Sequence, residues 1–299
     1  MSSSALVAGA PSLRPHHKRQ PSARQEQEWE GSTATGERRF VPEPASAWAL
    51  TLWGVMFTKS LWAVVLLTVL GGVGATAGDG IYAGLRQRMV DDIASDVQRT
   101  SARLSKPGLD TRVLKVMRTV PRHEFVPSQL QAEAYAHRPL PIGYGQTIAQ
   151  PSLVAVMTVL LDVDHDSRVL EVGTGSGYQA AILAALVQHV YSIEIIPELA
   201  DTARERLQRL GYTNTTTRAG DGYYGWEEHA PFDAIIVTAA ASHIPPPLLR
   251  QLKPDGRMVI PVGSAFLTQY LMLVHKDHAG QVTTRQVLPV AFVPLTGTR

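Results

Sequence analysis

The sequence of 299 residues contains no cysteine. This absence excludes a disulfide scaffold, a thiolate nucleophile and a zinc site with cysteine ligands, although it does not fix the cellular compartment. The 10 histidines are scattered along the chain and have no cysteine partners, so we predict no metal site. With 44% hydrophobic and 18% charged residues, the composition is ordinary for a globular protein with a sizeable core.

A basic excess is missing from most of the chain. Residues 1–59 hold 7 Lys and Arg against 5 Asp and Glu, whereas residues 79–299 hold 21 of each. Proteins that bind nucleic acid usually carry a basic excess or stripe in their folded part. We therefore expect no nucleic-acid partner.

The first 78 residues differ in character from the rest. Residues 1–47 are rich in Ser, Ala, Pro, Arg, Gln and Glu without apolar periodicity, and we predict that they are disordered. Residues 48–57 are hydrophobic, and residues 60–78 are 19 consecutive residues without charge. Because a bilayer span needs about 20 such residues, we predict that residues 48–78 contact a membrane as a signal or anchor segment.

The sequence leaves two fates open for this segment. From residue 56 onward, Lys59, an apolar stretch and the triplet from Ala75 to Ala77 have the layout of a secretory signal peptide, which is cleaved on export. In the alternative, the segment is retained as an anchor, and we expect the domain that follows to face the cytoplasm. The flanking charges do not settle the orientation, since Lys59 lies on one side and Arg86 and Arg88 lie on the other.

Residues 79–299 are predicted to form the folded domain. A first helix is predicted over 85–104, and a second is capped by Asp110 and ends near residue 119. Further on, helices alternate with strands, which predicts a doubly wound α/β fold: a mainly parallel, seven-stranded sheet with helices on both faces. The predicted strands are 168–172, 189–194, 215–218, 234–238, 257–261, 270–275 and 287–293, and the predicted helices between them are 178–187, 198–210 and 246–252.

A glycine loop follows the first of these strands. Gly173, Gly175 and Gly177 lie between the strand and a helix that starts near Tyr178, which is the arrangement of a nucleotide site. A dinucleotide loop needs G-x-G-x-x-G, but this loop is G-x-G-x-G, with Glu171 two positions before it. A carboxylate suits the sulfonium and ammonium groups of S-adenosyl-L-methionine and disfavours a pyrophosphate. The pattern E-x-G-x-G-x-G resembles motif I of the class I methyltransferases, which implies S-adenosyl-L-methionine as the cofactor.

Two further acids fit the same cofactor. Glu194 ends the second strand 21 residues after Gly173, at the distance where an acid can accept both ribose hydroxyls, although it could instead be a surface residue. Asp221 and Gly222 follow the third strand, where class I methyltransferases commonly place an acid against the adenine amino group; a plain Asp-Gly turn is the alternative. The predicted cofactor-binding residues are Glu171, Gly173, Gly175, Gly177, Glu194, Asp221 and Gly222.

The methyl acceptor has to be inferred from other segments. The Asn/Asp-Pro-Pro-aromatic motif of many base-directed amino methyltransferases is missing after the fourth strand. Instead, several segments together resemble protein-L-isoaspartate O-methyltransferases in the order of that family, over about residues 85–295. These segments are 120–127 (VPRHEFVP), 140–148 (LPIGYGQTI), 168–178 (RVLEVGTGSGY), 231–240 (PFDAIIVTAA), 252–263 (LKPDGRMVIPVG) and 292–295 (FVPL).

The resemblance implies a Rossmann-like methyltransferase fold and a role in protein repair. Such enzymes methylate the α-carboxylate of L-isoaspartyl residues in damaged proteins and peptides, and the methyl ester then closes to a succinimide that partly reopens to aspartate. Because a carboxylate is already ionised near pH 7, no strong general base is needed. The enzyme mainly aligns the reactants and excludes water. We expect a monomer.

In the family, the loop at 146–151 and the segment at 293–295 hold the isoaspartyl group. The resemblance implies substrate contacts by Gln146, Ile148, Val293, Pro294 and Leu295, and catalytic positions at Thr147 and Ala149. The family usually has Ser where this chain has Ala149, so one hydroxyl contact is lost. Two alternatives follow: a related methyltransferase with another acceptor or weakened activity, and a non-enzymatic, membrane-tethered binding module.

Overall fold

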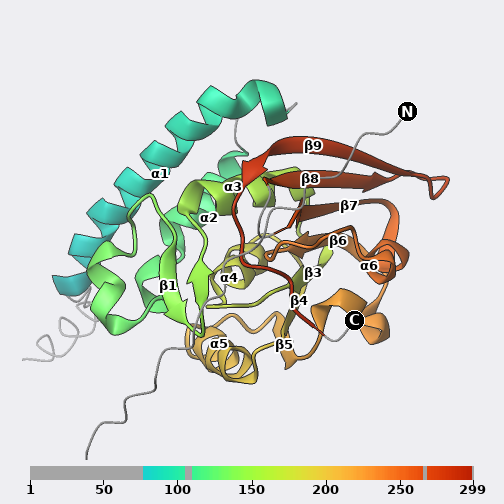
Figure 1. The fold of residues 1–299 in the computed structure, drawn as a ribbon. Coiled ribbons are helices and arrows are strands. Elements are labelled where there is room, and N and C mark those ends of the chain that lie inside the picture. Colours follow the sequence, from blue (N-terminus) through green and yellow to red (C-terminus); the bar gives the residue numbers. More distant parts are fainter. Residues whose placement is uncertain (1–76, 105–109, 265–267, 298–299) are drawn as a thin grey trace, which may run out of the picture. The chain divides into compact units, whose positions relative to one another are not determined.

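A seven-stranded sheet forms the centre of the described structure (Figure 1). The computed structural model describes residues 77–104, 110–264 and 268–297. Five neighbouring strands run parallel, and β8 is antiparallel to both of its neighbours. The predicted fold class, a mainly parallel seven-stranded α/β sheet, is thus confirmed. In spatial order the strands are β5 (Thr215–Ala219), β4 (His189–Glu194), β3 (Arg168–Val172), β6 (Phe232–Val237), β7 (Leu252–Val262), β8 (Gln269–Lys276) and β9 (Val282–Val290).

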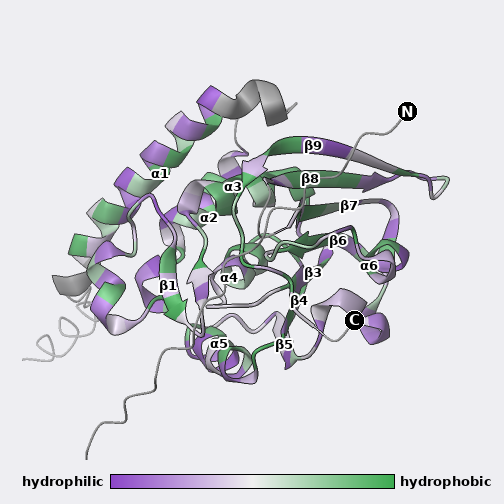
Figure 2. Ribbon diagram, viewed as in Figure 1, coloured by the Kyte–Doolittle hydropathy of each residue, from purple (hydrophilic) through white to green (hydrophobic). Residues whose placement is uncertain are grey.

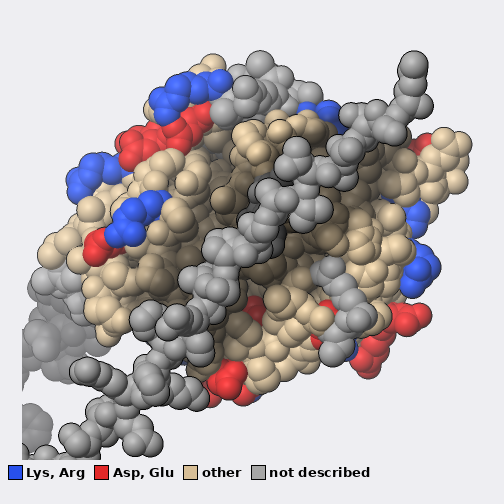
Figure 3. All heavy atoms as spheres, viewed as in Figure 1, with Lys and Arg blue, Asp and Glu red and all other residues tan. Residues whose placement is uncertain are grey.

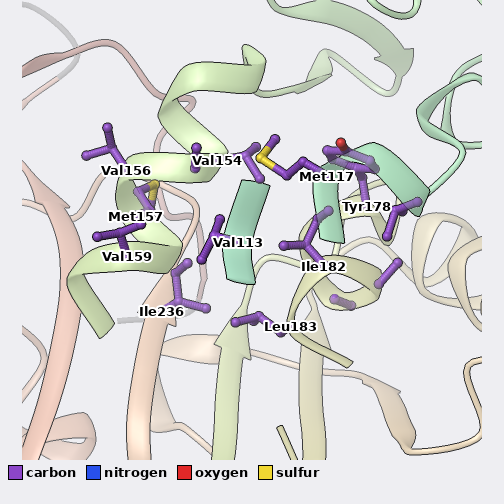
Figure 4. Packing of buried hydrophobic residues seen from close by; sticks show 14 of the residues in the cluster. Val113, Met117, Val154, Val156, Met157, Val159, Tyr178, Ile182, Leu183 and Ile236 are labelled. Atoms are coloured by element: carbon purple, nitrogen blue, oxygen red, sulfur yellow. The ribbon is translucent and has the colours of Figure 1, made fainter. Parts of the chain in front are cut away.

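Helices cover one face of the sheet as a layer (Figure 1). They are α1 (Ala77–Leu104), α2 (Thr111–Thr119), α3 (Pro151–Leu161) and α4 (Tyr178–Ala184), and α5 (Pro197–Arg209) packs against β4 and β5. The predicted cap of α2 is present, since the Asp110 carboxylate accepts a hydrogen bond from the Arg112 backbone N–H at 2.8 Å. Figure 4 shows side chains from α2, α3, α4 and β6 meeting in the core between this layer and the sheet.

A second, smaller core lies on the other face. Along β3, Val169 faces the first core, whereas Leu170 and Val172 face the second, as the two-residue period of a strand requires. This face is covered by α6 (Pro246–Gln251) and by the 3₁₀ helices η3 (Gly222–Tyr224) and η4 (Glu227–His229). In Figure 2 the strands at the centre are mostly hydrophobic, consistent with a sheet buried on both faces.

Several boundaries differ from the sequence prediction, and one helix was not predicted. The first helix begins at Ala77 rather than at residue 85, and β9 spans Val282–Val290 rather than 287–293. The prediction assigned no element to Pro151–Leu161, which forms α3. Ten of its eleven residues are buried, so its sequence is apolar all round and lacks the polar face by which an amphipathic helix is recognised.

The elements between α2 and α3 are short. Two 3₁₀ helices, η1 (Arg122–Phe125) and η2 (Ser128–Glu133), lead to a hairpin of β1 (Leu140–Gly143) and β2 (Gln146–Ile148). The predicted disordered region 1–47 lies outside the described residues, and so does the predicted signal or anchor segment 48–78, except for Ala77 and Gly78 at the start of α1. Within the described part of the chain, no helix has both the length and the hydropathy needed to cross a membrane.

Candidate functional site

The glycine loop turns sharply between β3 and α4. Gly173, Gly175 and Gly177 all have positive φ, at 99°, 52° and 86°, which favours glycine. At Gly173 space is also short, because a Cβ atom there would lie 2.4 Å from the Thr238 Oγ1 atom. The Thr238 hydroxyl donates a hydrogen bond to the Gly173 carbonyl at 2.6 Å. The loop is therefore fixed against the end of β6.

Glu194 ends β4 beside this loop, where the sequence predicted a cofactor-binding acid. Its Oε2 atom accepts a hydrogen bond from the Gly175 N–H at 2.8 Å, and its Oε1 atom accepts one from the Ile196 N–H at 3.1 Å. Glu194 is 6% exposed and lines the cavity described below. Its carboxylate thus holds the glycine loop and is available to a ligand.

Glu171 lies deeper than a direct cofactor contact would require. It is fully buried and is not among the residues that line the cavity. The Ser192 hydroxyl donates to its Oε2 atom, and the Thr174 hydroxyl lies 2.6 Å from Ser192 Oγ. Burial raises the pKa of Glu171 to about 8; the Ser192 hydrogen bond opposes this shift and the nearby Glu194 carboxylate adds to it. Its link to the glycine loop runs through Ser192 and Thr174.

Two other predicted cofactor residues also stand back from the cavity. Gly177 is the N-terminal cap of α4 and packs near Leu207. The Asp221 carboxylate caps η3 by accepting a hydrogen bond from the Tyr223 N–H at 2.9 Å. A Cβ atom on Gly297 would lie 2.2 Å from Asp221 Oδ2, so the C-terminal segment runs directly against this carboxylate. The roles of Gly177 and Asp221 in cofactor binding stay predictions.

The hairpin β1–β2 brings the predicted acceptor loop to the glycine loop. Its turn, Gly143 to Gly145, has positive φ at all three residues, and Tyr144 at its tip is 61% exposed. From β1, the Ile142 side chain packs over the glycine loop, 3.4 Å from where a Cβ atom on Gly175 would be. The four predicted residues of the acceptor loop that follow the turn line the cavity: Gln146, Thr147, Ile148 and Ala149.

The C-terminal segment forms the opposite wall. The Ala240 N–H donates to the Val293 carbonyl at 2.8 Å, and the Leu295 N–H donates to the Ala240 carbonyl at 2.7 Å. The buried Gln269 side chain fixes the same segment, because its amide both donates to the Phe292 carbonyl and accepts from the Phe292 N–H. The predicted substrate residues Val293, Pro294 and Leu295 all line the cavity.

One cavity of about 520 Å³ unites these walls. It joins the two predicted groups of residues, since both the glycine loop and the acceptor loop contribute to its lining. Of the fourteen residues in our predicted site, the lining includes all except Glu171, Gly177 and Asp221. Among the described residues, no group of three His, Asp or Glu side chains is placed to hold a metal ion.

Charges of both signs are mixed on one face of the molecule. On the face drawn in Figure 3, Lys and Arg side chains alternate with Asp and Glu side chains along α1. Mixed charges of this kind produce no extended field of one sign.

Comparison with known proteins places this arrangement in a family. Residues 98–299 match the family model described as Protein-L-isoaspartate(D-aspartate) O-methyltransferase (PCMT). The chain belongs to the PCMT family. This confirms the resemblance noted in the sequence.

Relatives within the PCMT family are highly similar. The chain is 62% identical over 240 residues to "Protein-L-isoaspartate O-methyltransferase 2" of Syntrophobacter fumaroxidans, covering 80% of this chain and 97% of that protein. It is 64% identical over 211 residues to the protein of the same name from Polaromonas sp., covering 71% of this chain and all of that protein. A Plasmodium falciparum structure, described as a PCMT in complex with S-adenosyl-L-homocysteine, is 25% identical with a TM-score of 0.58, covering 72% of this chain and 98% of that one.

Several residues that line the PCMT cavity were missed by the sequence analysis. Leu153, Val154 and Met157 come from α3, which was not predicted, and Pro139 precedes β1. Much of the remaining wall comes from the segment Leu288 to Phe292 and from Tyr178, Gln179, Ile195, Ile196, Thr238 and Thr296. For α3 a signal was available: Pro151 at the first helical position, followed by an apolar run of helical length.

Proposed function

We propose that this protein transfers a methyl group from S-adenosyl-L-methionine to the α-carboxylate of L-isoaspartyl residues in damaged proteins and peptides. The observation that carries this proposal is that the glycine loop and the acceptor loop line one cavity. Membership of the PCMT family and relatives at 62% and 64% identity support the same reaction.

The cavity fits the proposed cofactor. The Glu194 carboxylate, at the carboxyl end of β4, is placed to accept hydrogen bonds from ribose hydroxyls. Gly173 and Gly175 lie in the same wall and carry no side chains of their own. When bound, S-adenosyl-L-methionine supplies an electrophilic methyl group on a sulfonium centre. We assign Gly173, Gly175, Glu194 and Gly222 to its direct contacts, and Glu171 to support of the loop.

The other wall suits a carboxylate acceptor. Among the described residues that line the cavity, Glu194 has the only carboxyl group, and no His, Lys or Arg side chain lines it. This lining offers no strong base, and a carboxylate needs none, because it is ionised well below pH 7. The contribution of the protein is then alignment and exclusion of water by the acceptor loop and residues 293–295.

Ala149 is the departure from the family pattern that bears on this proposal. It lies in the cavity wall at the position where the family usually has Ser, so its methyl group offers the acceptor no hydrogen bond. Thr147 remains as a hydroxyl in the same wall. Ser152, in contrast, is turned toward His137, with Ser152 Oγ 3.2 Å from His137 Nε2. Thr147 is therefore the hydroxyl that we assign to the acceptor.

The test is a transfer assay on the purified full chain. Labelled S-adenosyl-L-methionine is supplied with an isoaspartyl peptide and, as the matched control, with its aspartyl twin. The proposal requires label in the isoaspartyl peptide alone. Binding of the cofactor without transfer to that peptide would instead favour a related methyltransferase with a different acceptor.

We further propose that residues 48–78 bring the enzyme to a membrane and that the enzyme is a monomer. The first part rests on the charge-free stretch from residue 60 to residue 78. Mass spectrometry of the mature N-terminus separates the two fates: a chain that begins near Gly78 has lost a signal peptide, and an intact chain has kept an anchor. Recovery of the intact chain from the aqueous fraction after cell lysis would contradict membrane contact.

A further inference from the structure

One buried arginine contacts two residues of the cavity wall, Ala149 and Tyr178, although it does not line the cavity itself. Arg122, the first residue of η1, is 0% exposed. Its Nε atom donates a hydrogen bond to the Ala134 carbonyl at 2.7 Å, and its Nη2 atom donates to the Ala149 carbonyl at 2.7 Å. The guanidinium group thus holds the backbone of the acceptor loop at the position where the family hydroxyl is missing.

The same group contacts the cofactor side of the cavity. The guanidinium carbon of Arg122 lies 4.7 Å from the centre of the Tyr178 ring, within the range of a cation–π interaction. Tyr178 is the first residue of α4, directly after the glycine loop, and it lines the cavity. Phe125, also from η1, meets the Tyr178 ring edge-on at 5.5 Å. Arg122 therefore joins the acceptor loop to the helix that follows the glycine loop.

Stability alone does not account for an arginine here. Burying a charged group is costly unless it is paired, and apolar side chains of similar volume often serve a core as well or better. Among the described residues, no carboxylate forms an ion pair or a hydrogen bond with Arg122, and its Nη1 atom has no hydrogen-bond partner. The planar fork of arginine, in contrast, can reach two carbonyl groups and stack on a ring at once.

We propose that Arg122 is a positioning residue that fixes the acceptor loop relative to α4. The inference rests on the proposed function, because it concerns the alignment of the acceptor. With alanine at 149, that alignment depends more on the loop backbone, and the Arg122–Ala149 hydrogen bond restrains the backbone at this residue.

Two substitutions of Arg122 and one control separate positioning from structural support. R122K keeps the positive charge but loses the planar guanidinium group. R122M keeps much of the side-chain volume but loses both the charge and the guanidinium group. The control is R168K. Arg168 also donates to a backbone carbonyl, that of His229 at 3.0 Å, and lies over a tyrosine ring, that of Tyr191 at 5.3 Å, but neither His229 nor Tyr191 lines the cavity.

For R122K we expect kcat on the isoaspartyl peptide to fall roughly ten- to hundredfold, the effect of one lost hydrogen bond to a charged group. The affinity for S-adenosyl-L-homocysteine should change less than about threefold, because its proposed contacts are intact. R122M should lose at least as much activity, and R168K should keep the wild-type kcat. Equal kcat in the folded fractions of wild type and R122K would overturn the inference, as would a parallel collapse of cofactor affinity.

A readout without catalysis keeps this inference distinct from the proposed function. With S-adenosyl-L-homocysteine present, hydrogen exchange in the peptide covering residues 146–153 should be faster in R122K than in wild type and unchanged in R168K. No change in R122K overturns the positioning role, whatever the acceptor is. If the wild-type enzyme binds cofactor but does not methylate the isoaspartyl peptide, the proposed function fails and the exchange result still decides the role of Arg122.

The wild-type enzyme provides a check that does not depend on the variants folding. The side-chain Nε–H resonance of Arg122 can be followed by NMR in the complex with S-adenosyl-L-homocysteine. Addition of the isoaspartyl peptide should shift this resonance and leave that of Arg168 unchanged. An unshifted Arg122 resonance at a peptide concentration that saturates the site would overturn the inference.

Discussion

The carboxylate of Glu194 offers a direct test of how the glycine loop and the cofactor are held. In E194Q one carboxylate oxygen is replaced by an amide NH₂ group. In the wild type, both carboxylate oxygens of Glu194 accept backbone hydrogen bonds, one from the Gly175 N–H at 2.8 Å and one from the Ile196 N–H at 3.1 Å. The amide can accept only one of them, and its NH₂ group then faces an N–H donor.

The size of the effect follows from these contacts. A hydrogen bond to a charged group contributes about 1.5–3 kcal/mol, and a buried donor left without its partner costs a similar amount. Since 1.36 kcal/mol is a factor of ten, the affinity for S-adenosyl-L-homocysteine should fall roughly ten- to hundredfold. The ribose contact proposed for Glu194 adds to this loss.

Calorimetric titration of S-adenosyl-L-homocysteine into wild type, E194Q and E198Q provides the measurement. Glu198 is a suitable control, because it is an exposed acid at the start of α5, four positions along the chain, and its replacement makes the same change in charge. E198Q should bind as wild type does. If E194Q also binds as wild type does, Glu194 neither shapes the loop nor contacts the cofactor, and the assignment is wrong.

Three further substitutions test other parts of the site. A149S should raise kcat/KM on the isoaspartyl peptide by about tenfold, the value of one regained hydrogen bond, and an unchanged rate would show that the acceptor does not reach this position. Burial raises the pKa of Glu171 from an ordinary 4.5 to about 8, so its contribution to the free energy of unfolding is full below pH 4.5 and is lost as the pH rises toward 8. Between these pH values, urea unfolding of E171Q should therefore show a smaller loss of stability than unfolding of the wild type. Identical stability profiles would contradict the raised pKa. G222A places a Cβ atom 2.4 Å from Val172 Cγ1, so it should lower the free energy of unfolding by about 1–3 kcal/mol. Adding V172A to G222A should restore part of that loss. If the effects of the two substitutions on the free energy of unfolding are strictly additive, the clash is absent.

The elements that carry the cofactor site were predictable because their signals are local. The predicted ranges of β3 and β4 match the structure, since each is a short apolar strand bounded by a turn. The glycine loop between β3 and α4 needs positive φ at Gly173, Gly175 and Gly177, a requirement that glycine spacing records in the sequence. The predicted site residues of the acceptor loop and of residues 293–295 came from motifs, and all of them line the cavity.

What the sequence could not supply depends on burial and on long-range contacts. Periodicity does not distinguish α3 from other apolar runs, because it is buried on nearly all sides. The depth of Glu171 could not be predicted, since an acid before a glycine loop looks the same whether it faces a ligand or a serine hydroxyl. Arg122 was part of a recognised motif, but its contacts with Ala149 and Tyr178 join segments 27 and 56 positions away.

Mass spectrometry of the product peptides is the decisive test of isoaspartyl methyl transfer. The full-length enzyme, S-adenosyl-L-methionine and an equal mixture of an isoaspartyl peptide and its aspartyl twin are incubated together, and the two peptides are separated over time. We predict a methyl ester on the isoaspartyl peptide alone, followed by its succinimide and a growing fraction of aspartyl peptide. Persistence of both peptides unmethylated, by an enzyme shown to bind the cofactor, would contradict this prediction.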